Sequence, residues 1–245
     1  MNKVIRKLVI LSGPSGTGKT TLANLFEENN REQYQTVRTV TTRTPRFAGE
    51  PYIFTTETEF LKIMERDGFL ETTCYNNALY GSPKETVEEI WQNNKTPIWV
   101  INPNGRQQII DRKYENIQVL SVFLVATPFL VYERLVERDG LSFNLVNRLR
   151  LSLEEIQQSS TYDALIVNDD MENALMEFTQ TVFKWKTDSP SNLIKVYLEE
   201  AVRVLVFAAR TVLIQDFGRE PIAEEVAALA DYPVEKTSAV LKRIH

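Results

Sequence analysis

The sequence predicts an α/β protein with a parallel sheet core, further segments inserted between its strands, and a small helical region at its end. Three observations support this fold. Short apolar runs typical of buried strands alternate with longer helix-type segments up to residue 167. A phosphate-binding loop follows the first of these runs, and residues 189–245 read as helix throughout.

The strands of the core are predicted from four apolar runs. Strands that alternate with helices form parallel sheets covered on both faces, and ligands bind beyond the carboxyl ends of such strands. Two stretches interrupt the alternation, one at about residues 38–83 and one with four arginines at about 133–150. The four predicted strands are residues 7–11, 98–101, 119–126 and 164–167.

The loop at residues 13–20 reads G-P-S-G-T-G-K-T and matches the G-x-x-x-x-G-K-[ST] pattern between a strand and a helix. Its glycines allow a tight turn whose N–H groups face a polyphosphate, and the following helix start adds a positive dipole end. Lys19 supplies a charge to the β- and γ-phosphates, and Thr20 supplies a hydroxyl for Mg²⁺. The residues predicted to bind a nucleoside triphosphate are Gly13, Ser15, Gly16, Thr17, Gly18, Lys19, Thr20 and Thr21.

The composition excludes several classes of function. A net charge of −5 argues against general attraction to nucleic acid or to membrane surfaces. The single histidine is the last residue, which excludes Ser-His-Asp or Cys-His catalysis and a histidine-rich zinc site. Cys74 is the only cysteine, so an intrachain disulfide is excluded, and no signal-peptide pattern is found. We expect a cytoplasmic protein without a membrane anchor.

A second set of motifs begins with T-T-R-T-P-R at residues 41–46, where two arginines lie three residues apart in an extended segment. Two arginines in one loop suit a phosphate, because their donors are fork-like. Y-I-F at residues 52–54, F-L-E at 69–71 and Y-G-S at 80–82 follow in order. Together these motifs resemble the nucleoside monophosphate (NMP) site of guanylate kinases, and the resemblance covers roughly residues 5–185.

The resemblance implies a P-loop nucleoside monophosphate kinase fold, with an NMP-binding insertion at residues 38–83 and a lid at 133–150. It also implies phosphorylation of GMP by ATP with Mg²⁺. Glu71 would accept from guanine N1–H and the 2-amino group, two adjacent donors that adenine lacks. The other residues implied in GMP binding are Thr39, Arg43, Arg46, Tyr52, Tyr80, Gly81, Ser82 and Asn102.

The resemblance also implies which residues drive the reaction. Phosphoryl transfer depends on positioning and on charge around the transferring group, so Lys19, Arg43, Arg138 and Arg148 would be the catalytic residues. Arg134 and Asn168 would contact the donor ATP, Asn168 at its adenine, and Thr20 would hold the metal.

Two departures from the family pattern leave alternatives open. Val100 and Asn102 stand where the family usually has acidic residues, and the spacing from Arg46 to Tyr52 is short. The chain is therefore also compatible with a weak or inactive guanylate-kinase-like module that senses nucleotide or binds a protein. A third reading is a kinase for another nucleoside monophosphate.

The end of the chain reads as a separate helical domain. The composition becomes linker-like near residues 187–192, which predicts a boundary between domains 1–188 and 189–245. One helix is expected over residues 192–216 with a stop at Gly218, and Pro221 is expected at the first position of the next helix. Residues 216–227 weakly resemble helical region three of bacterial sigma factors. Residues 190–245 carry seven Lys/Arg and eight Asp/Glu, about −1 in net charge. This balance favours protein contact or dimerisation over nucleic acid.

Overall fold

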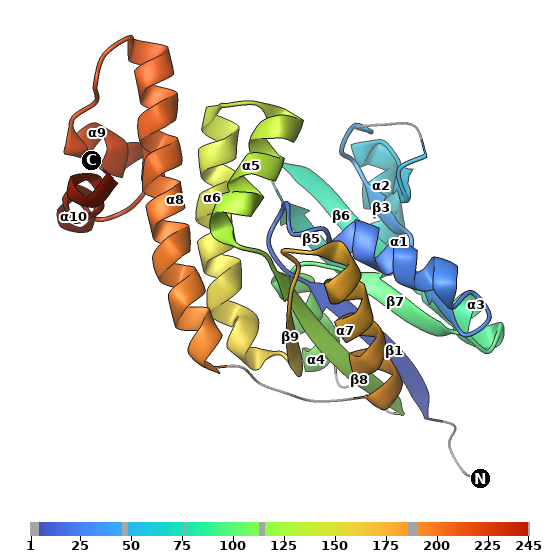
Figure 1. Ribbon diagram of the computed structural model, residues 1–245. Helices are drawn as coiled ribbons and strands as arrows, with labels where there is room; N and C mark the ends of the chain where they lie inside the picture. The colour runs from blue at the N-terminus through green and yellow to red at the C-terminus, as the bar shows by residue number, and fades with distance from the viewer. Residues whose placement is uncertain (1–4, 46–48, 76, 113–115, 186–190, 245) are drawn as a thin grey trace. The chain divides into compact units, whose positions relative to one another are not determined.

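The structure is a computed structural model that describes residues 5–45, 49–75, 77–112, 116–185 and 191–244 (Figure 1). The chain forms two compact units. The first comprises Met1–Ser12, Lys19–Val122 and Thr179–Trp185, and the second comprises Gly13–Gly18, Phe123–Phe178 and Lys186–His245. The division passes through a strand of the central sheet, between Val122 and Phe123.

The central sheet has the strand order β2-β7-β1-β8-β9, and β7 pairs in parallel with both β1 and β2. Its inner strand β1 is buried from Leu8 to Ser12, as an apolar run between two helical layers should be. The strands are β1 (Arg6–Ser12), β2 (Tyr34–Thr36), β7 (Thr96–Val100), β8 (Ile117–Val125) and β9 (Ala164–Val167).

The first unit also contains a second sheet, formed by the segment that interrupts the alternation. Its order is β4-β3-β6-β5, and its register sets Glu71 opposite Ser82 and Thr41 opposite Tyr80. The strands are β3 (Thr39–Thr41), β4 (Tyr52–Phe54), β5 (Phe69–Tyr75) and β6 (Ala78–Pro83). The helices of this unit are α1 (Lys19–Asn29), α2 (Glu57–Glu65), α3 (Lys84–Gln92) and α4 (Pro103–Asp111).

The second unit is mainly helical. Ser142 caps α6 by accepting a hydrogen bond from the N–H of Leu145, and α5 ends at Gly140 with a φ of 71°. Its elements are α5 (Pro128–Asp139), α6 (Phe143–Gln157), the 3₁₀ helix η1 (Gln158–Thr161), β9, α8 (Ser191–Phe217), α9 (Ala223–Ala230) and α10 (Val234–Ile244). Helix α7 (Met171–Lys184) begins in this unit, and its residues from Thr179 onward belong to the first unit.

The long helix α8 shares one apolar core with α5 and α6, and Figure 1 shows it running alongside them. Leu205 and Ala209 of α8 are fully buried in the same cluster as Leu135 of α5 and Leu145 of α6. Val226 and Ala230 of α9 extend this cluster. The C-terminal helices are therefore packed on the helices that follow β8.

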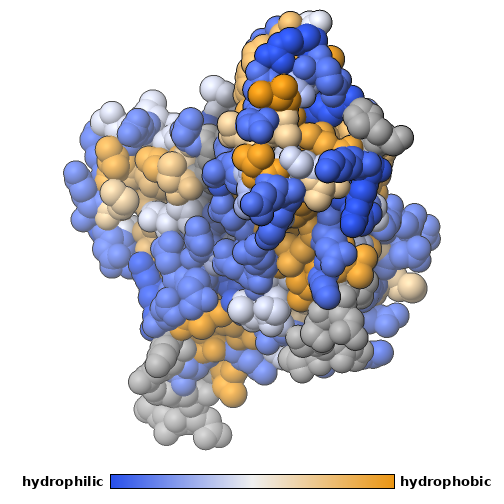
Figure 2. Space-filling view, turned by 90° about the vertical axis from the view of Figure 1, so that its left-hand side faces the viewer, coloured by the Kyte–Doolittle hydropathy of each residue, from blue (hydrophilic) through white to orange (hydrophobic). Residues whose placement is uncertain are grey.

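Several apolar side chains of α8–α10 and the connections between them are exposed. Figure 2 views the protein from the side on which Figure 1 draws α8–α10 and shows apolar patches separated by hydrophilic residues. None of the helices in the described ranges is long and apolar enough to cross a membrane. The exposed apolar residues are Val196, Phe217, Ile222 and Val234.

The predicted fold class is confirmed: a mostly parallel sheet core carries a C-terminal helical region. All four predicted strands are present, and Gly218 ends α8 with a φ of 66°. The prediction for Pro221 is wrong, because α9 begins at Ala223 and its N-cap is Ile222, whose N–H donates to Glu225. The boundary between residues 188 and 189 stays a prediction, since the second unit joins α8–α10 to α5 and α6.

Candidate active site

The phosphate loop closes on itself through Thr17, whose Oγ1 donates to the carbonyl of Pro14 at 2.9 Å. Gly16 and Gly18 have φ values of 87° and 88°, in the left-handed region that favours glycine. A Cβ on Gly18 would collide with the side-chain amide of Asn168. The last glycine of the motif is thus required both by its backbone conformation and by close packing.

Asn168 lies directly against the loop, at the end of β9. Its side chain is fully buried, its Nδ2 donates to the carbonyl of Thr17 at 2.7 Å, and its backbone N–H donates to Val125. The amide nitrogen therefore supports the loop. Its predicted contact with adenine stays a prediction.

Three arginines of α5 and α6 reach the same loop. Arg134 donates to the carbonyls of Gly16 and Asn168, at 3.4 and 3.3 Å. Arg138 and Arg148 both donate to the hydroxyl of Ser15, at 3.4 and 3.2 Å. The structure thus brings together the predicted lid arginines and the predicted phosphate loop.

A carboxylate that the sequence analysis did not single out lies between two of these arginines. Asp139 Oδ2 is 2.8 Å from Arg138 Nη2 and 3.6 Å from Arg148 Nη1. Arg148 is buried, and its Nε has no hydrogen-bond partner in the part of the chain that the structure describes. These donors suit an anion with several acceptor oxygens.

In the first unit, Arg43 forms a two-pronged contact with the buried carboxylate of Glu50, at 2.6 and 3.2 Å. The guanidinium also lies over the ring of Tyr52, with 5.1 Å to its centroid. Burial opposes the charge, but hydrogen bonding to Glu50 and the proximity of Tyr80 raise the pKa of Arg43. Arg46 lies outside the described residues.

Glu71 is a buried acid of the same unit. Only 2% of the residue is exposed, and Ser82 Oγ donates to its Oε1 at 2.7 Å. Burial raises the pKa of Glu71 to about 7, although hydrogen bonds from Ser82 and the charge of Arg112 oppose this shift. A Cβ at Gly105 would lie 2.8 Å from Glu71 Oε2, so only glycine leaves room for this carboxylate.

Two other predicted GMP residues lie in the same small sheet. Thr39 is buried and pairs in register with Tyr52, whose ring centroid lies 6.2 Å from that of Tyr80. Gly81 has no room for a side chain, because a Cβ there would lie 2.8 Å from Phe69. The sheet therefore gathers Thr39, Tyr52, Glu71, Tyr80, Gly81 and Ser82 in one unit.

Asn102, which the resemblance implied in GMP binding, has a structural task in this fold. Its Oδ1 accepts from the N–H of Gly105 at 2.9 Å and caps α4, and Pro103 occupies the first helical position. Val100 ends β7 and supplies no ligand atom. The described residues hold no group of three or more His, Cys, Asp or Glu side chains that could bind a metal ion. Lys19, Thr20 and Thr21 form the first turn of α1.

Comparison with known proteins agrees with this arrangement of motifs. The family model of guanylate kinase matches residues 5–184. This chain belongs to the guanylate kinase family. A guanylate kinase of Trichormus variabilis is 33% identical over 182 residues, which cover 72% of this chain and 89% of that protein. One of Chlamydia felis is 30% identical over 184 residues, which cover 73% and 88%.

The fold has a counterpart among solved guanylate kinases. The crystal structure of the enzyme from Anaplasma phagocytophilum matches with a TM-score of 0.59 and covers 89% of this chain and 98% of that one. At 23% identity this likeness supports the fold alone. The family assignment therefore rests on the sequence matches, and the solved structure agrees with it in fold.

Sequence reasoning about this guanylate kinase family member missed three contacts. It assigned no role to Asp139, and it treated Trp99 only as part of a strand. Gln108 of α4 also escaped notice, although its side-chain amide makes two hydrogen bonds with the backbone of Thr72 on β5. No sequence signal identifies these partners, because each contact depends on how the chain folds back on itself.

Proposed function

We propose that this chain transfers the γ-phosphoryl group of ATP to GMP, giving ADP and GDP. The proposal rests on the burial of the Glu71 carboxylate and on the space that Gly105 leaves beside its Oε2 atom. Carboxylate oxygens match the adjacent N1–H and 2-amino donors of guanine, and a base without these donors would leave a buried acceptor unpaired.

In the proposed reaction an oxygen of the GMP phosphate attacks the γ-phosphorus of ATP in line. The bond to the bridging oxygen of the β-phosphate breaks, and its electrons stay on ADP. Lys19, Arg138 and Arg148 offset the charge on the transferring group, and Arg43 holds the acceptor phosphate. No general base is required, because the attacking phosphate oxygen is already ionised at neutral pH.

The residues present suit a Mg²⁺ ion that is held mainly by the nucleotide phosphates. The described residues offer no carboxylate cluster, but the hydroxyl of Thr20 follows the phosphate loop directly. Mg²⁺ commonly takes few protein ligands and completes its shell with phosphates and water. When bound, Mg²⁺ supplies positive charge to the β- and γ-phosphates.

A coupled assay of ADP release tests the proposal. The purified chain is given ATP and Mg²⁺ with GMP, dGMP, AMP, CMP or UMP as acceptor. We expect GMP to give the highest kcat/KM by at least about 10-fold. Equal or faster turnover of AMP would reject the assignment of GMP as substrate.

A second candidate function rests on Val100 and Asn102, the neutral residues at the end of β7. Both side chains are neutral, and the Oδ1 of Asn102 accepts a hydrogen bond from the N–H of Gly105. A guanylate-kinase-like module that binds nucleotide without turnover would bind GMP in calorimetry and release no ADP. The same purified sample distinguishes this function from the first.

We expect Asn102→Asp to lower the Mg²⁺ concentration needed for half-maximal activity by several-fold. Aspartate caps a helix as well as asparagine does, so α4 is retained, and the added carboxylate strengthens binding of a hard cation. The measurement is a Mg²⁺ titration of turnover at saturating nucleotides. Asn104→Asp, at an exposed position of the same helix, is the matched control. An unchanged Mg²⁺ dependence in a folded Asn102→Asp variant contradicts the expectation.

We expect Glu71→Gln to lower kcat/KM for GMP on the order of 100-fold, with little change in the KM for ATP. The substituted side chain can still accept from Ser82 through its amide oxygen, which turns its NH₂ group toward the guanine donors. Steady-state kinetics with both nucleotides varied provide the measurement. Glu59→Gln, on the exposed side of α2, is the control. Parental use of GMP by Glu71→Gln would remove Glu71 from the site.

The pKa of Glu71 gives this prediction a pH dependence. Because burial raises that pKa to about 7, the carboxylate fraction grows as the pH rises through 7. The KM for GMP should fall about 10-fold between pH 6 and pH 8 as the acceptor forms. The GMP phosphate also ionises near pH 6, so Glu71→Gln supplies the baseline without the carboxylate. In the ligand-free protein, the folded state holds the proton of Glu71 more tightly than the unfolded state does. The free energy of unfolding therefore falls as the pH rises from about 4.5 to about 7.

We propose that α8–α10 form a surface for protein contact or self-association, in preference to nucleic acid. Exposed apolar side chains at Val196, Ile222 and Val234 support this role, and a net charge of about −1 over residues 190–245 does not favour nucleic acid. Light scattering over a range of protein concentrations tests self-association. Binding of duplex DNA with a steep salt dependence would favour nucleic acid instead.

The domain boundary and the cellular location are two further proposals. We propose that residues 1–188 contain every nucleotide contact and that residues 189–245 form an added helical domain. We also propose a cytoplasmic location, because the exposed thiol of Cys74 is suited to a reducing compartment.

A further inference from the structure

Three buried groups from three strands of the first unit form a short hydrogen-bonded chain. The indole Nε1 of Trp99 on β7 donates to Ser82 Oγ on β6 at 2.5 Å. Ser82 Oγ in turn donates to Glu71 Oε1 on β5 at 2.7 Å. At most 2% of any of the three residues is exposed, so water does not compete for these bonds.

The direction of the chain follows from its first member. An indole N–H can only donate, so Ser82 Oγ must accept from Trp99. The single hydroxyl hydrogen of Ser82 is then free to point at Glu71, which receives it as an acceptor. A Glu71 that carried its proton on Oε1 and donated it to Ser82 would require the serine hydrogen to find another acceptor. In the part of the chain that the structure describes, Ser82 Oγ forms its hydrogen bonds with Trp99 and Glu71. The bond from Ser82 therefore fixes Oε1 as an acceptor, and a negative charge on Glu71 strengthens this bond.

We propose that Trp99 is a positioning residue for guanine selection: its indole N–H orients the Ser82 hydroxyl and thereby holds Glu71 as an acceptor toward the base. This inference rests on the proposed function. Burial raises the pKa of Glu71, but the hydroxyl of Ser82, the charge of Arg112 at the α4 C-cap and the backbone N–H of Ser82 act in the opposite direction and favour the carboxylate.

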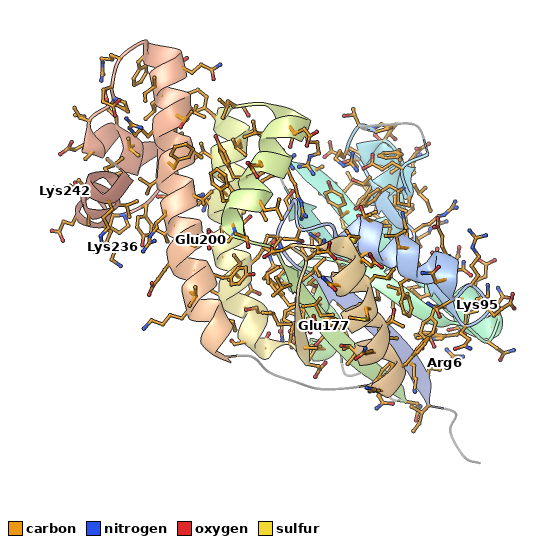
Figure 3. The ribbon with its side chains drawn as sticks, viewed as in Figure 1. Arg6, Lys95, Glu177, Glu200, Lys236 and Lys242 are labelled. Carbon is orange, nitrogen blue, oxygen red and sulfur yellow. The ribbon has the colours of Figure 1, made fainter. Side chains whose placement is uncertain are left out.

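The surroundings of Trp99 provide a matched control. Trp99 lines an open cleft of about 1040 Å³, and Trp91 of α3 lines the same cleft. The Nε1 of Trp91 donates to the backbone carbonyl of Lys7 at 2.9 Å, away from Glu71. Arg6, labelled in Figure 3, lies over the Trp91 ring and pairs with Glu88. Removing the N–H of Trp91 therefore deletes an indole hydrogen bond to a backbone carbonyl and leaves the chain from Trp99 to Glu71 intact.

The experiment compares Trp99→Phe with Trp91→Phe in the full chain, by steady-state kinetics with GMP and with AMP between pH 6 and pH 8. We expect Trp99→Phe to raise the KM for GMP about 3- to 10-fold, as loss of one hydrogen bond does, with kcat within about 2-fold of the parent. The pH at which the KM falls should move upward. The ratio of AMP to GMP use should rise, because a protonated Glu71 can donate to adenine N1. Trp91→Phe should change none of these quantities.

A double-mutant cycle tests whether Trp99 acts on Glu71 through the hydroxyl of Ser82. Ser82→Ala removes the intermediate hydroxyl, so Trp99→Phe should add little to its effect on the KM for GMP. Additive effects of the two substitutions would overturn the proposal, as would a Trp99→Phe variant that behaves like Trp91→Phe. If Trp99→Phe does not fold, benzothienylalanine at position 99 keeps the ring shape without the N–H, and the same outcomes apply.

Failure of this inference is distinct from failure of the proposed function. A parent chain that does not prefer GMP in the acceptor panel refutes the function itself. A parent that prefers GMP, with a Trp99→Phe variant that keeps the parental KM and pH profile, refutes only the role of Trp99.

Discussion

Replacement of Lys19 by alanine is expected to lower kcat/KM for phosphoryl transfer on the order of 1000-fold. Lys19 is the first residue of α1 and follows the phosphate loop directly. Its ammonium group is a compact charge that would meet the negative charge on the β- and γ-phosphates. The reaction offers little covalent chemistry for the protein to assist, so loss of such a charge removes a large part of the rate.

The measurement is ADP release under saturating ATP and GMP, with thermal unfolding to verify that Lys19→Ala is folded. Lys62→Ala removes an exposed lysine of α2 and serves as the control for the loss of one positive charge. Turnover by Lys19→Ala within about 10-fold of the parent, in a preparation free of other kinases, is incompatible with the role given to Lys19.

Leu205→Ala is expected to lower the free energy of unfolding by about 2–5 kcal/mol. Leu205 is fully buried at the centre of α8, in the cluster that joins this helix to α5 and α6. Removing its isobutyl group leaves a cavity that the surrounding side chains fill only in part. Because Arg138 and Arg148 are carried by α5 and α6, turnover should fall more than the affinity for GMP.

Urea denaturation gives the change in stability, and kinetics beside GMP titration separate the two functional effects. Val196→Ala lies on the same helix with 61% of the residue exposed, and its effect should stay within about 0.5 kcal/mol. A Leu205→Ala variant with the parental midpoint would mean that α8 does not support these helices.

The sequence predicted those parts of the structure that depend on local pattern. The strand at residues 164–167 is confirmed as β9, and the phosphate loop lies between β1 and α1, because apolar runs and glycine spacing are local signals. The fold of the core and the family followed from these signals. The helix cap formed by Asn102 was not predicted, although asparagine before proline is typical of a helix start.

Other features depend on contacts between distant residues, which periodicity does not encode. An apolar helix face predicts that α8 is buried against something, but not that its partners are α5 and α6. The bond from Trp99 to Ser82 joins strands of two different sheets, β7 and β6, which a local pattern does not place together. The pairing of Asp139 with Arg148 likewise requires the turn between α5 and α6 to close.

The arginines assigned to phosphate binding share a property that affects how tightly a nucleotide can bind. Arg43 already has a carboxylate partner in Glu50, and Arg138 and Arg148 share Asp139. A phosphate group that binds one of these arginines replaces a carboxylate as its partner. The free energy of binding is therefore the difference between the arginine–phosphate pair and the arginine–carboxylate pair. The carboxylates also keep the guanidinium groups ordered beforehand, which reduces the entropy lost on binding. Affinity at these positions is therefore set by Glu50 and Asp139 as much as by the arginines themselves.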